Sequence, residues 1–296
     1  MTKTLTLFCI AWLCLINPAL AADISLNTVK IEELTGVKGK LNEKEGVFKV
    51  TLPRTDIKAI VAGVKMNPEL GLGAWAAFTN AGNHVMVMGD MVLLEDQVNP
   101  VMSAALDNGL EVTALHNHFL WDSPRIMFMH IGGMGDEMTL AKAVGQVFNK
   151  LKETRDAKPA VPNTDIDPIN SSLDPKKIEV IIGTPGSMKD GVFKIVIGRK
   201  AKMGEHEVGK EMGINTWAAF AGSDDKAIVD GDFAMLEDEV QNVLKVLRGA
   251  GINIVAIHNH MINETPRFVF LHYWGVGAAT DLAKALKAAL DTQGMQ

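Results

Sequence analysis

The chain carries the same pattern twice at a constant spacing. Ala114-Leu115-His116-Asn117-His118 is matched by Ala256-Ile257-His258-Asn259-His260, and each residue of the second copy lies 142 positions after its counterpart. In both copies Pro-Arg, a phenylalanine and a third histidine follow, so that His130 is matched by His272. Trp-Ala-Ala-Phe, Gly-Asp and Leu-Glu-Asp segments recur upstream at the same spacing. A chain with this pattern is expected to fold as two related units.

The repeats define the domain organisation. Gly46-Val47-Phe48-Lys49 matches Gly191-Val192-Phe193-Lys194 at a spacing of 145, which implies a three-residue difference in the length of one loop. Between the copies, residues 153–177 contain four prolines among Asp, Asn and Ser, a composition typical of a linker. We therefore predict repeat 1 at residues 23–152, a Pro-rich linker at 153–177 and repeat 2 at 178–296.

Residues 1–22 have the pattern of a secretory signal peptide. Lys3 precedes an apolar run from Leu5 to Ile16, and small residues follow, which predicts cleavage after Ala21 or Ala22 and a periplasmic or secreted protein. The apolar run is shorter than the roughly 20 residues of a spanning helix, so no transmembrane anchor is expected in the mature chain. Both cysteines fall within this segment, which leaves nitrogen and oxygen as the only metal ligands of the mature protein.

The net charge limits the class of partner. Without Lys3 the mature chain has 28 Lys and Arg residues against 35 Asp and Glu residues, a formal charge of −7 (28 − 35). Nucleic acid is therefore excluded as an expected partner, because such proteins carry basic surfaces. A small molecule or a metal ion is the partner that the sequence favours.

The hydrophobic periodicity predicts a mixed α+β fold. Strands are expected at residues 47–52, 75–78, 84–91, 111–118 and 125–131, and helices at 94–108 and 137–151. Repeat 2 has the same order of patterns. We predict two tandem homologous α/β-layer repeats with mainly antiparallel sheets, related by a pseudo-two-fold axis. Trp75 and Trp217 begin apolar strands and are expected in the core.

The histidines form the candidate site. Residues i and i+2 share one face of a strand, so each His-x-His pair is expected to project together, with the third histidine on a neighbouring strand. Neutral imidazoles in this arrangement suit Zn, Fe(II), Mn or Cu. The predicted ligands are His116, His118, His130, His258, His260 and His272, and the acidic side chains predicted to add a ligand or a base are Glu95, Glu237, Asp122 and Glu264.

Other roles fit the same residues. The histidines also fit a structural function in a tight loop, or an anion-binding patch together with Arg125 and Arg267. Each of these arginines equally fits an internal salt bridge to Asp90 or Asp232. Asn117 and Asn259 are interpreted as amides that fix the loop.

This set of segments resembles the bacterial LppY/LpqO family, which carries a domain of unknown function. The resemblance rests on Gly-Asp, Leu-Glu-Asp, Ala-Leu-His-Asn-His, Pro-Arg, Phe-x-His and Gly-x-Gly, and it covers nearly the whole mature chain in both repeats. It implies no particular activity. The chain departs from the family's namesakes, which are lipoproteins, because neither Cys9 nor Cys14 has the small-residue context of lipid attachment.

Three functional hypotheses follow. The first is an exported protein that binds a divalent metal, a small anionic ligand near Arg125 or Arg267, or both. The second is a metal-dependent hydrolase or oxidoreductase in which Glu95 or Glu264 serves as base. The third is a non-catalytic interaction module of the cell envelope with structural histidines.

Overall fold

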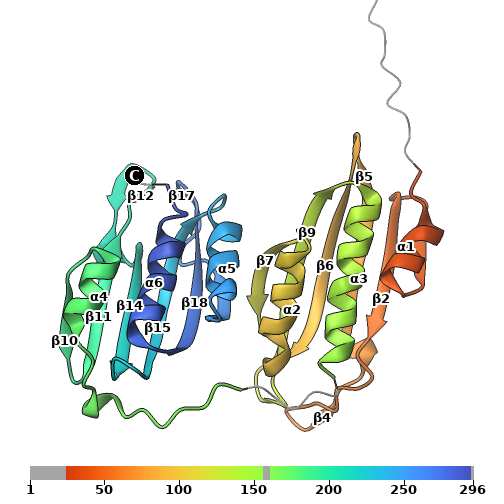
Figure 1. Cartoon of the computed structure of the whole chain (residues 1–296). Coiled ribbons are helices and arrows are strands. Elements are labelled where there is room, and N and C mark those ends of the chain that lie inside the picture. The colour runs from red at the N-terminus through yellow and green to blue at the C-terminus, as the bar shows by residue number, and fades with distance from the viewer. Residues whose placement is uncertain (1–24, 156–160, 295–296) are drawn as a thin grey trace, which may run out of the picture.

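The two repeats stand side by side and share one sheet (Figure 1). The computed structural model of the chain describes residues 25–155 and 161–294. The predicted signal peptide and its cleavage sites lie outside the described residues.

Each repeat has three α-helices and nine strands within the described ranges, and short 3₁₀ helices lie at Pro68–Leu70, Pro168–Asn170 and Lys210–Met212. Repeat 1 contains α1 (Thr28–Thr35), β1 (Gly39–Asn42), β2 (Val47–Pro53), β3 (Ile60–Val61), β4 (Val64–Lys65), β5 (Gly73–Ala81), β6 (His84–Leu94), α2 (Glu95–Asp107), β7 (Glu111–His116), β8 (Asp122–Ser123), β9 (Ile126–Gly135) and α3 (Glu137–Glu153). Repeat 2 contains α4 (Pro175–Ile182), β10 (Gly186–Lys189), β11 (Val192–Gly198), β12 (Ala201–Met203), β13 (His206–Val208), β14 (Asn215–Gly222), β15 (Ala227–Leu236), α5 (Val240–Gly249), β16 (Asn253–His258), β17 (Glu264–Thr265), β18 (Phe268–Gly277) and α6 (Ala279–Leu290).

The main sheet has twelve strands in the order β1-β2-β5-β6-β9-β7-β16-β18-β15-β14-β11-β10. The second half of this order repeats the first half in reverse, and β7 pairs with β16 antiparallel through Leu115 and Ile257. The predicted α+β class, antiparallel pairing and tandem repetition are confirmed. The layers of the two repeats are joined edge to edge. Two further sheets of three short strands, β4-β3-β8 and β13-β12-β17, complete the fold.

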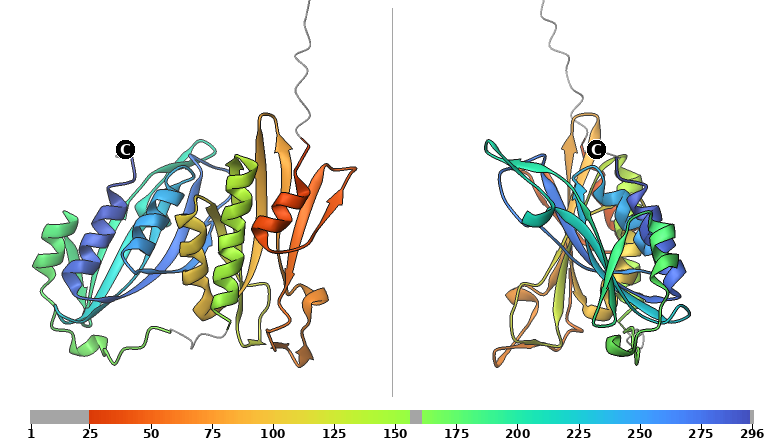
Figure 2. Two further views of the ribbon diagram at one scale, coloured as in Figure 1. Left: turned by 45° about the vertical axis from the view of Figure 1, so that its right-hand side comes forward. Right: turned by 90° about the vertical axis from the view of Figure 1, so that its left-hand side faces the viewer.

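The six α-helices of the described residues cover one face of the main sheet (Figures 1 and 2). Strand residues alternate accordingly, since Ala74, Ala76 and Phe78 of β5 are buried under the helices, whereas Trp75 between them faces the other side. The apolar core continues from one repeat into the other. Trp75 and Trp217 therefore lie half-buried on the open face, and the prediction that they belong to the core is wrong.

Helices α1 and α4 were not predicted. Both have eight residues and depend on their caps: the side chain of Asn27 accepts a hydrogen bond from the Lys30 N–H, and Gly36 ends α1 in the left-handed conformation. In α4 the side chain of Asp174 accepts a hydrogen bond from the Lys176 N–H, and Gly183 ends the helix in the left-handed conformation. Helix α4 begins inside the segment predicted as linker. Each helix of the described ranges is too short or too polar to reach across a lipid bilayer.

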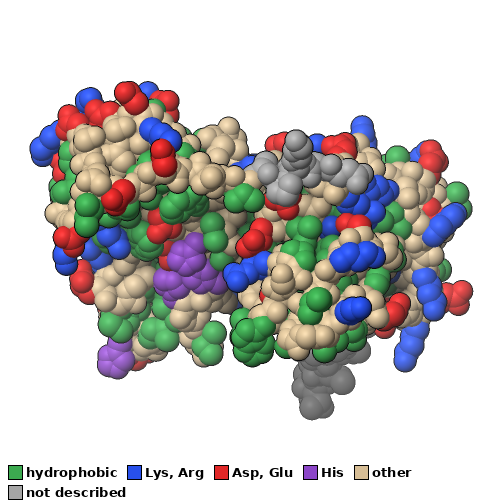
Figure 3. Space-filling view, turned by 90° about the horizontal axis from the view of Figure 1, so that it is seen from below, with side chains coloured by type: hydrophobic (Ala, Val, Ile, Leu, Met, Phe, Trp, Pro, Cys, Tyr) green, Lys and Arg blue, Asp and Glu red, His purple; other side chains and the backbone are tan. Residues whose placement is uncertain are grey.

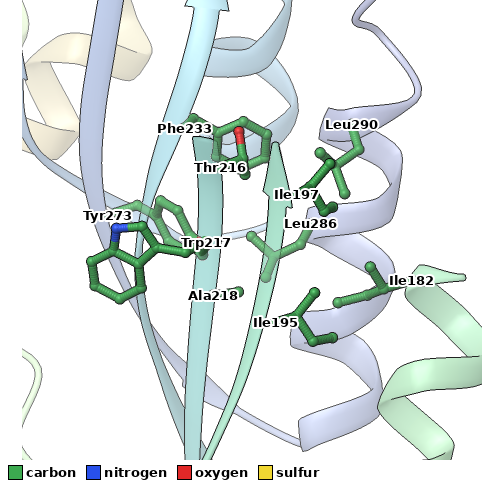
Figure 4. Close-up of a pocket in the computed structure, with 10 residues that line it drawn as sticks. All are labelled: Ile182, Ile195, Ile197, Thr216, Trp217, Ala218, Phe233, Tyr273, Leu286 and Leu290. Atoms are coloured by element: carbon green, nitrogen blue, oxygen red, sulfur yellow. The ribbon is translucent and has the colours of Figure 1, made fainter. Parts of the chain in front are cut away.

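The packing under repeat 2 leaves one small gap. It lies between the sheet and helices α4 and α6, where Ile182, Ile195 and Leu286 meet Phe233 and Tyr273 (Figure 4). Its volume is about 10 Å³, the lower limit for one water molecule, and its lining is apolar. It is an imperfection of packing and leaves no room for a ligand.

Two side-chain amides join the repeats across their boundary. The Asn99 side chain on α2 donates to the Ile254 carbonyl at 3.2 Å and accepts from the Ile254 N–H at 2.8 Å. Gln241 on α5 makes the equivalent pair of bonds with Val112, both at 2.9 Å. Both strands are irregular at these points, so each amide satisfies backbone groups that the ladder misses.

An arginine in each repeat, fully buried in repeat 1 and largely buried in repeat 2, ties the start of a helix to the sheet. Arg54 is fully buried, bonds the Val92 carbonyl and donates to Gln97 and Asp56. Its counterpart Arg199 donates to Glu239 at 2.5 and 3.1 Å. Repeat 1 has its three extra residues between Arg54 and Ala59, so the predicted difference in loop length is confirmed. Asp56 lies in this longer loop and supplies the counter-charge for Arg54.

Replacing Glu239 with alanine is expected to lower the free energy of unfolding by about 3 kcal/mol, because Arg199 would stay buried without a counter-charge. Denaturant unfolding at pH 7 measures this loss. Glu237→Ala is the matched control, since the exposed Glu237 should contribute within about 0.5 kcal/mol. Equal losses in the two variants would contradict the assignment.

The same ion pair predicts a pH dependence. Burial alone would raise the pKa of Glu239, but hydrogen bonds from Arg199 and the Leu236 N–H outweigh it and hold the pKa below its ordinary value of 4.5. The ionised carboxylate therefore contributes stability above pH 4.5, which is lost as the pH falls through the folded-state pKa. Glu239→Ala should show a weaker loss of stability than the wild type over this acid range.

Candidate metal centre

Strand register brings an aspartate to each third histidine. His130 on β9 pairs with Asp90 on β6, and His272 on β18 pairs with Asp232 on β15. On the other side of β9 lies β7, which ends in His116. These side chains project from the open face, because their neighbours along each strand are buried beneath the helices. The sheet thus places one carboxylate and two imidazoles together in each repeat.

The second histidine of each His-x-His pair follows the strand. Strand β7 ends at His116 and β16 ends at His258, so the prediction that both histidines of a pair lie on one strand is corrected. The next turn still returns the second ring to the site. His118 stacks on Phe128 with ring centroids 3.3 Å apart, and His260 stacks on Phe270 at 3.5 Å. The phenylalanine of each repeat is therefore a platform for the second histidine.

Repeat 2 contains the tightest group of ligand atoms. Among the described residues, one set of three brings its ligand atoms within 4.8 Å of one another, namely Asp232, His258 and His272. Ligands at about 2.0–2.2 Å around a tetrahedral metal lie about 3.3–3.5 Å apart, so small rotations would close the site. His260 lies beside it, with its Nε2 atom 3.3 Å from Asp232 Oδ2.

Backbone carbonyls orient the rings of repeat 2. The Nδ1 atoms of His258, His260 and His272 lie 3.3, 3.1 and 3.3 Å from the carbonyl oxygens of Asn259, Gly213 and Gly231. Because a carbonyl oxygen only accepts, these contacts favour the tautomer with its hydrogen on Nδ1. The Nε2 lone pair is then available to a metal, and a backbone carbonyl holds the ring, as in many metal sites.

The candidate centre contains buried donor atoms that a bound cation would satisfy. Asp232 Oδ1 and His258 Nε2 are buried and have no hydrogen-bond partner among the described residues. Burial raises the pKa of Asp232 to about 6, against an opposing effect of His272. Burial also lowers the pKa values of His258 and His260, which keeps these imidazoles neutral at pH 7. A bound divalent cation would satisfy both unpaired atoms and favour the ionised carboxylate.

Repeat 1 has the same residues in a different arrangement. His116 Nε2 and His130 Nε2 lie 3.0 Å apart, and Asp90 Oδ1 is buried without a hydrogen-bond partner among the described residues. Burial raises the pKa of Asp90 and lowers that of His118. Repeat 1 therefore retains the donor set.

The acidic loop residues have another role. Asp122 accepts a hydrogen bond from the Ile126 N–H at 2.7 Å, and the buried Glu264 accepts one from the Phe268 N–H at 3.0 Å. Each carboxylate thus closes the turn that leads into the strand of the third histidine. The sequence suggested them as ligands or bases, whereas the structure gives them a positioning role.

The arginines pair with the other predicted carboxylates. Arg125 lies 3.9 Å from Glu95, and Arg267 lies 3.6 Å from Glu237, with both pairs exposed. The alternative salt bridges to Asp90 and Asp232 are therefore replaced by bridges to Glu95, which begins α2, and to Glu237, in the turn before α5. Asn117 donates to the Phe119 carbonyl at 2.6 Å, which confirms its interpretation as a loop-fixing amide.

Sequence reasoning missed Asp90 and Asp232 as members of the site. The signal was present, because Gly-Asp recurs in both copies. The glycine of this pair is explained by packing, because a Cβ atom on Gly231 would lie 2.4 Å from the Trp217 carbonyl oxygen and would also clash with Tyr273. The recurrence of the aspartate alone could have identified it.

Histidine side chains gather in one surface patch on the half of the molecule that holds repeat 2 (Figure 3). Acidic and basic side chains lie close to this patch in the same view. His258, His260 and His272 are each partly exposed, whereas the Asp232 carboxylate beneath them is buried.

Replacing Asp232 with asparagine is expected to stabilise the protein after treatment with a chelator. At pH 7 the gain should be on the order of 2 kcal/mol, because the wild-type carboxylate ionises in the folded state with a pKa of about 6 instead of 3.8. The gain should vanish as the pH falls to about 4. Thermal and denaturant unfolding measure it, with the exposed Asp238→Asn as control; lower stability of the Asp232 variant at pH 7 would contradict the analysis.

Comparison with known proteins identifies a family match but no activity. The family described as Domain of Unknown Function (DUF1259) matches the chain twice, over residues 29–150 and 176–292. No curated protein matches the chain. Among solved structures, the trimeric bacterial microcompartment shell protein PduB is 12% identical over 86% of this chain and 89% of that one, with a TM-score of 0.22, which is too low to support any argument.

Proposed function

This chain belongs to the family described as Domain of Unknown Function (DUF1259), and we propose that it binds a divalent transition metal. The observation that carries the proposal is the convergence of Asp232, His258 and His272 within 4.8 Å. Two atoms of this group are buried and have no hydrogen-bond partner within the described part of the chain, a state that metal binding would relieve. Asp90, His116 and His130 form the corresponding, weaker site of repeat 1.

The donor set limits the choice of metal. Two imidazoles and one carboxylate suit Zn or Fe(II), and Mn and Cu accept the same donors with different geometry. Ca²⁺ and Mg²⁺ are disfavoured because they prefer a shell of oxygen ligands. Three protein ligands leave coordination positions for water or for another molecule.

A metal-dependent hydrolase or oxidoreductase is the second candidate. It is favoured by the open coordination positions and by the partial exposure of the three histidine rings. Glu264 is engaged with the Phe268 N–H, so His260 replaces it as the candidate proton-transfer group beside the metal. A structural envelope module remains the alternative if no metal binds.

Metal content tests the proposal. The full chain, purified without a histidine tag and reloaded with Zn, Fe(II), Mn or Cu in turn, should retain about one tightly bound equivalent of a preferred metal. His258→Ala/His272→Ala should lose it, because both nitrogen ligands are removed. Elemental mass spectrometry measures the content, and circular dichroism checks that the variant is folded.

The matched control is the equivalent pair in repeat 1. His116→Ala/His130→Ala should retain the tightly bound metal and lose only a weaker second site. Wild-type protein that binds none of the four metals, or a metal content that neither pair of changes alters, would overturn the proposal.

We further propose that the protein is exported and related to the LppY/LpqO proteins. The support is the signal-like pattern of residues 1–22 and the recurrence of the segments that carry the resemblance. Intact-mass measurement of protein expressed with its own N-terminus should show loss of the first 21 or 22 residues. A mass that retains them would contradict export by this route.

A further inference from the structure

A hollow of about 490 Å³ lies on the open face of repeat 2, next to the candidate metal centre. Asp232 of the centre and His260 beside it form part of its wall. Trp217, Lys194, Lys210 and the acidic Glu211 line it as well. Its size suits a small metabolite, since ligand pockets commonly have volumes of about 300–1,000 Å³.

Two lysines make one side of the hollow basic. Lys194 on β11 places its Nζ atom 4.1 Å from the ring centroid of Trp217, which holds the ammonium group over the aromatic face. Lys210 lies in the short 3₁₀ helix Lys210–Met212, which follows β13. Both are exposed, and within residues 25–155 and 161–294 neither forms a salt bridge. Glu211 and Asp230 lie near these lysines, but neither ammonium group is held in a salt bridge among the described residues, so both can turn toward a ligand.

The basic side is a property of repeat 2. In repeat 1, Lys49 lies over Trp75 at 4.0 Å in the same way, but Pro68 stands where repeat 2 has Lys210. The lysine–tryptophan pair is thus common to both copies, and the second lysine accompanies the tighter group of metal ligands. Lys49 therefore provides an internal comparison for Lys194.

We propose that this hollow binds a small anionic ligand, with its carboxylate or phosphate group held by Lys194 and Lys210. The inference rests on the proposed function for its second contact, because the far end of the ligand would reach the open positions of a metal held by Asp232, His258 and His272. The sequence suggested Arg125 and Arg267 as the anion site, but each of these arginines is paired with a glutamate. The proposed anion site is therefore formed by the two lysines instead.

Calorimetric titration of the zinc-loaded full chain, freed of unbound metal, tests the proposal. Inorganic phosphate and sodium acetate are the probes, titrated separately to distinguish the two sources of negative charge. We expect one of them to bind, and Lys210→Met and Lys194→Met each to weaken that binding about tenfold, since each removes a charged contact. Lys49→Met is the matched control and should leave the affinity unchanged.

The outcomes separate this inference from the proposed function. Absence of binding by both probes, or equal weakening by Lys49→Met, overturns the anion site while the metal site stands. Lysine-dependent binding to a protein that takes up no metal supports the anion site and rejects the metal proposal. Because all three lysines are exposed, their replacement leaves the fold intact, and elemental analysis of each variant shows whether its metal content is unchanged.

Discussion

The pairing of β6 with β9, and of β15 with β18, is the constraint on which both candidate centres depend. It sets Asp90 opposite His130, and the same register recurs in repeat 2. A shift of one residue would carry the histidine beneath the helices and bring Met129 and Ile131 into solvent. Burial of these apolar side chains therefore fixes the register, and the register fixes the distance between carboxylate and imidazole. The strand register therefore determines both the packing of the core and the geometry of the site.

The sequence predicted the parts of the fold that have a long periodic pattern. Two helices and five strands of each repeat show such a pattern, whereas α1 and α4 are too short and depend on caps such as Asn27 and Gly36. Prolines near α4 further concealed it, although Pro175 occupies the first turn, where it is tolerated. The histidines were found because they recur. Their aspartate partners also recur, but the strand register that sets them opposite the histidines depends on contacts between distant residues, so the recurrence alone did not show which histidine each aspartate faces.

The two repeats have the same core and different charges. Both keep a largely or fully buried arginine at the start of the central helix, yet Arg54 is balanced by Asp56 from a longer loop, and Arg199 is balanced by Glu239. Such a position tolerates a change of partner only if a counter-charge remains, because a lone buried charge is costly. The two candidate centres also differ in charge, because repeat 2 has Asp230 at the position where repeat 1 has the uncharged Met88.

Asn99 and Gln241 each complete the backbone hydrogen bonds of a strand that belongs to the other repeat. A single repeat would leave these groups, and the edge of β7, without partners. Contacts that each half makes equally with the other define an isologous interface, the kind found in two-fold homodimers. The chain corresponds to a two-fold homodimer whose two subunits are linked in one polypeptide. Joining the copies in one polypeptide allows equivalent positions to carry different residues, which identical subunits cannot do.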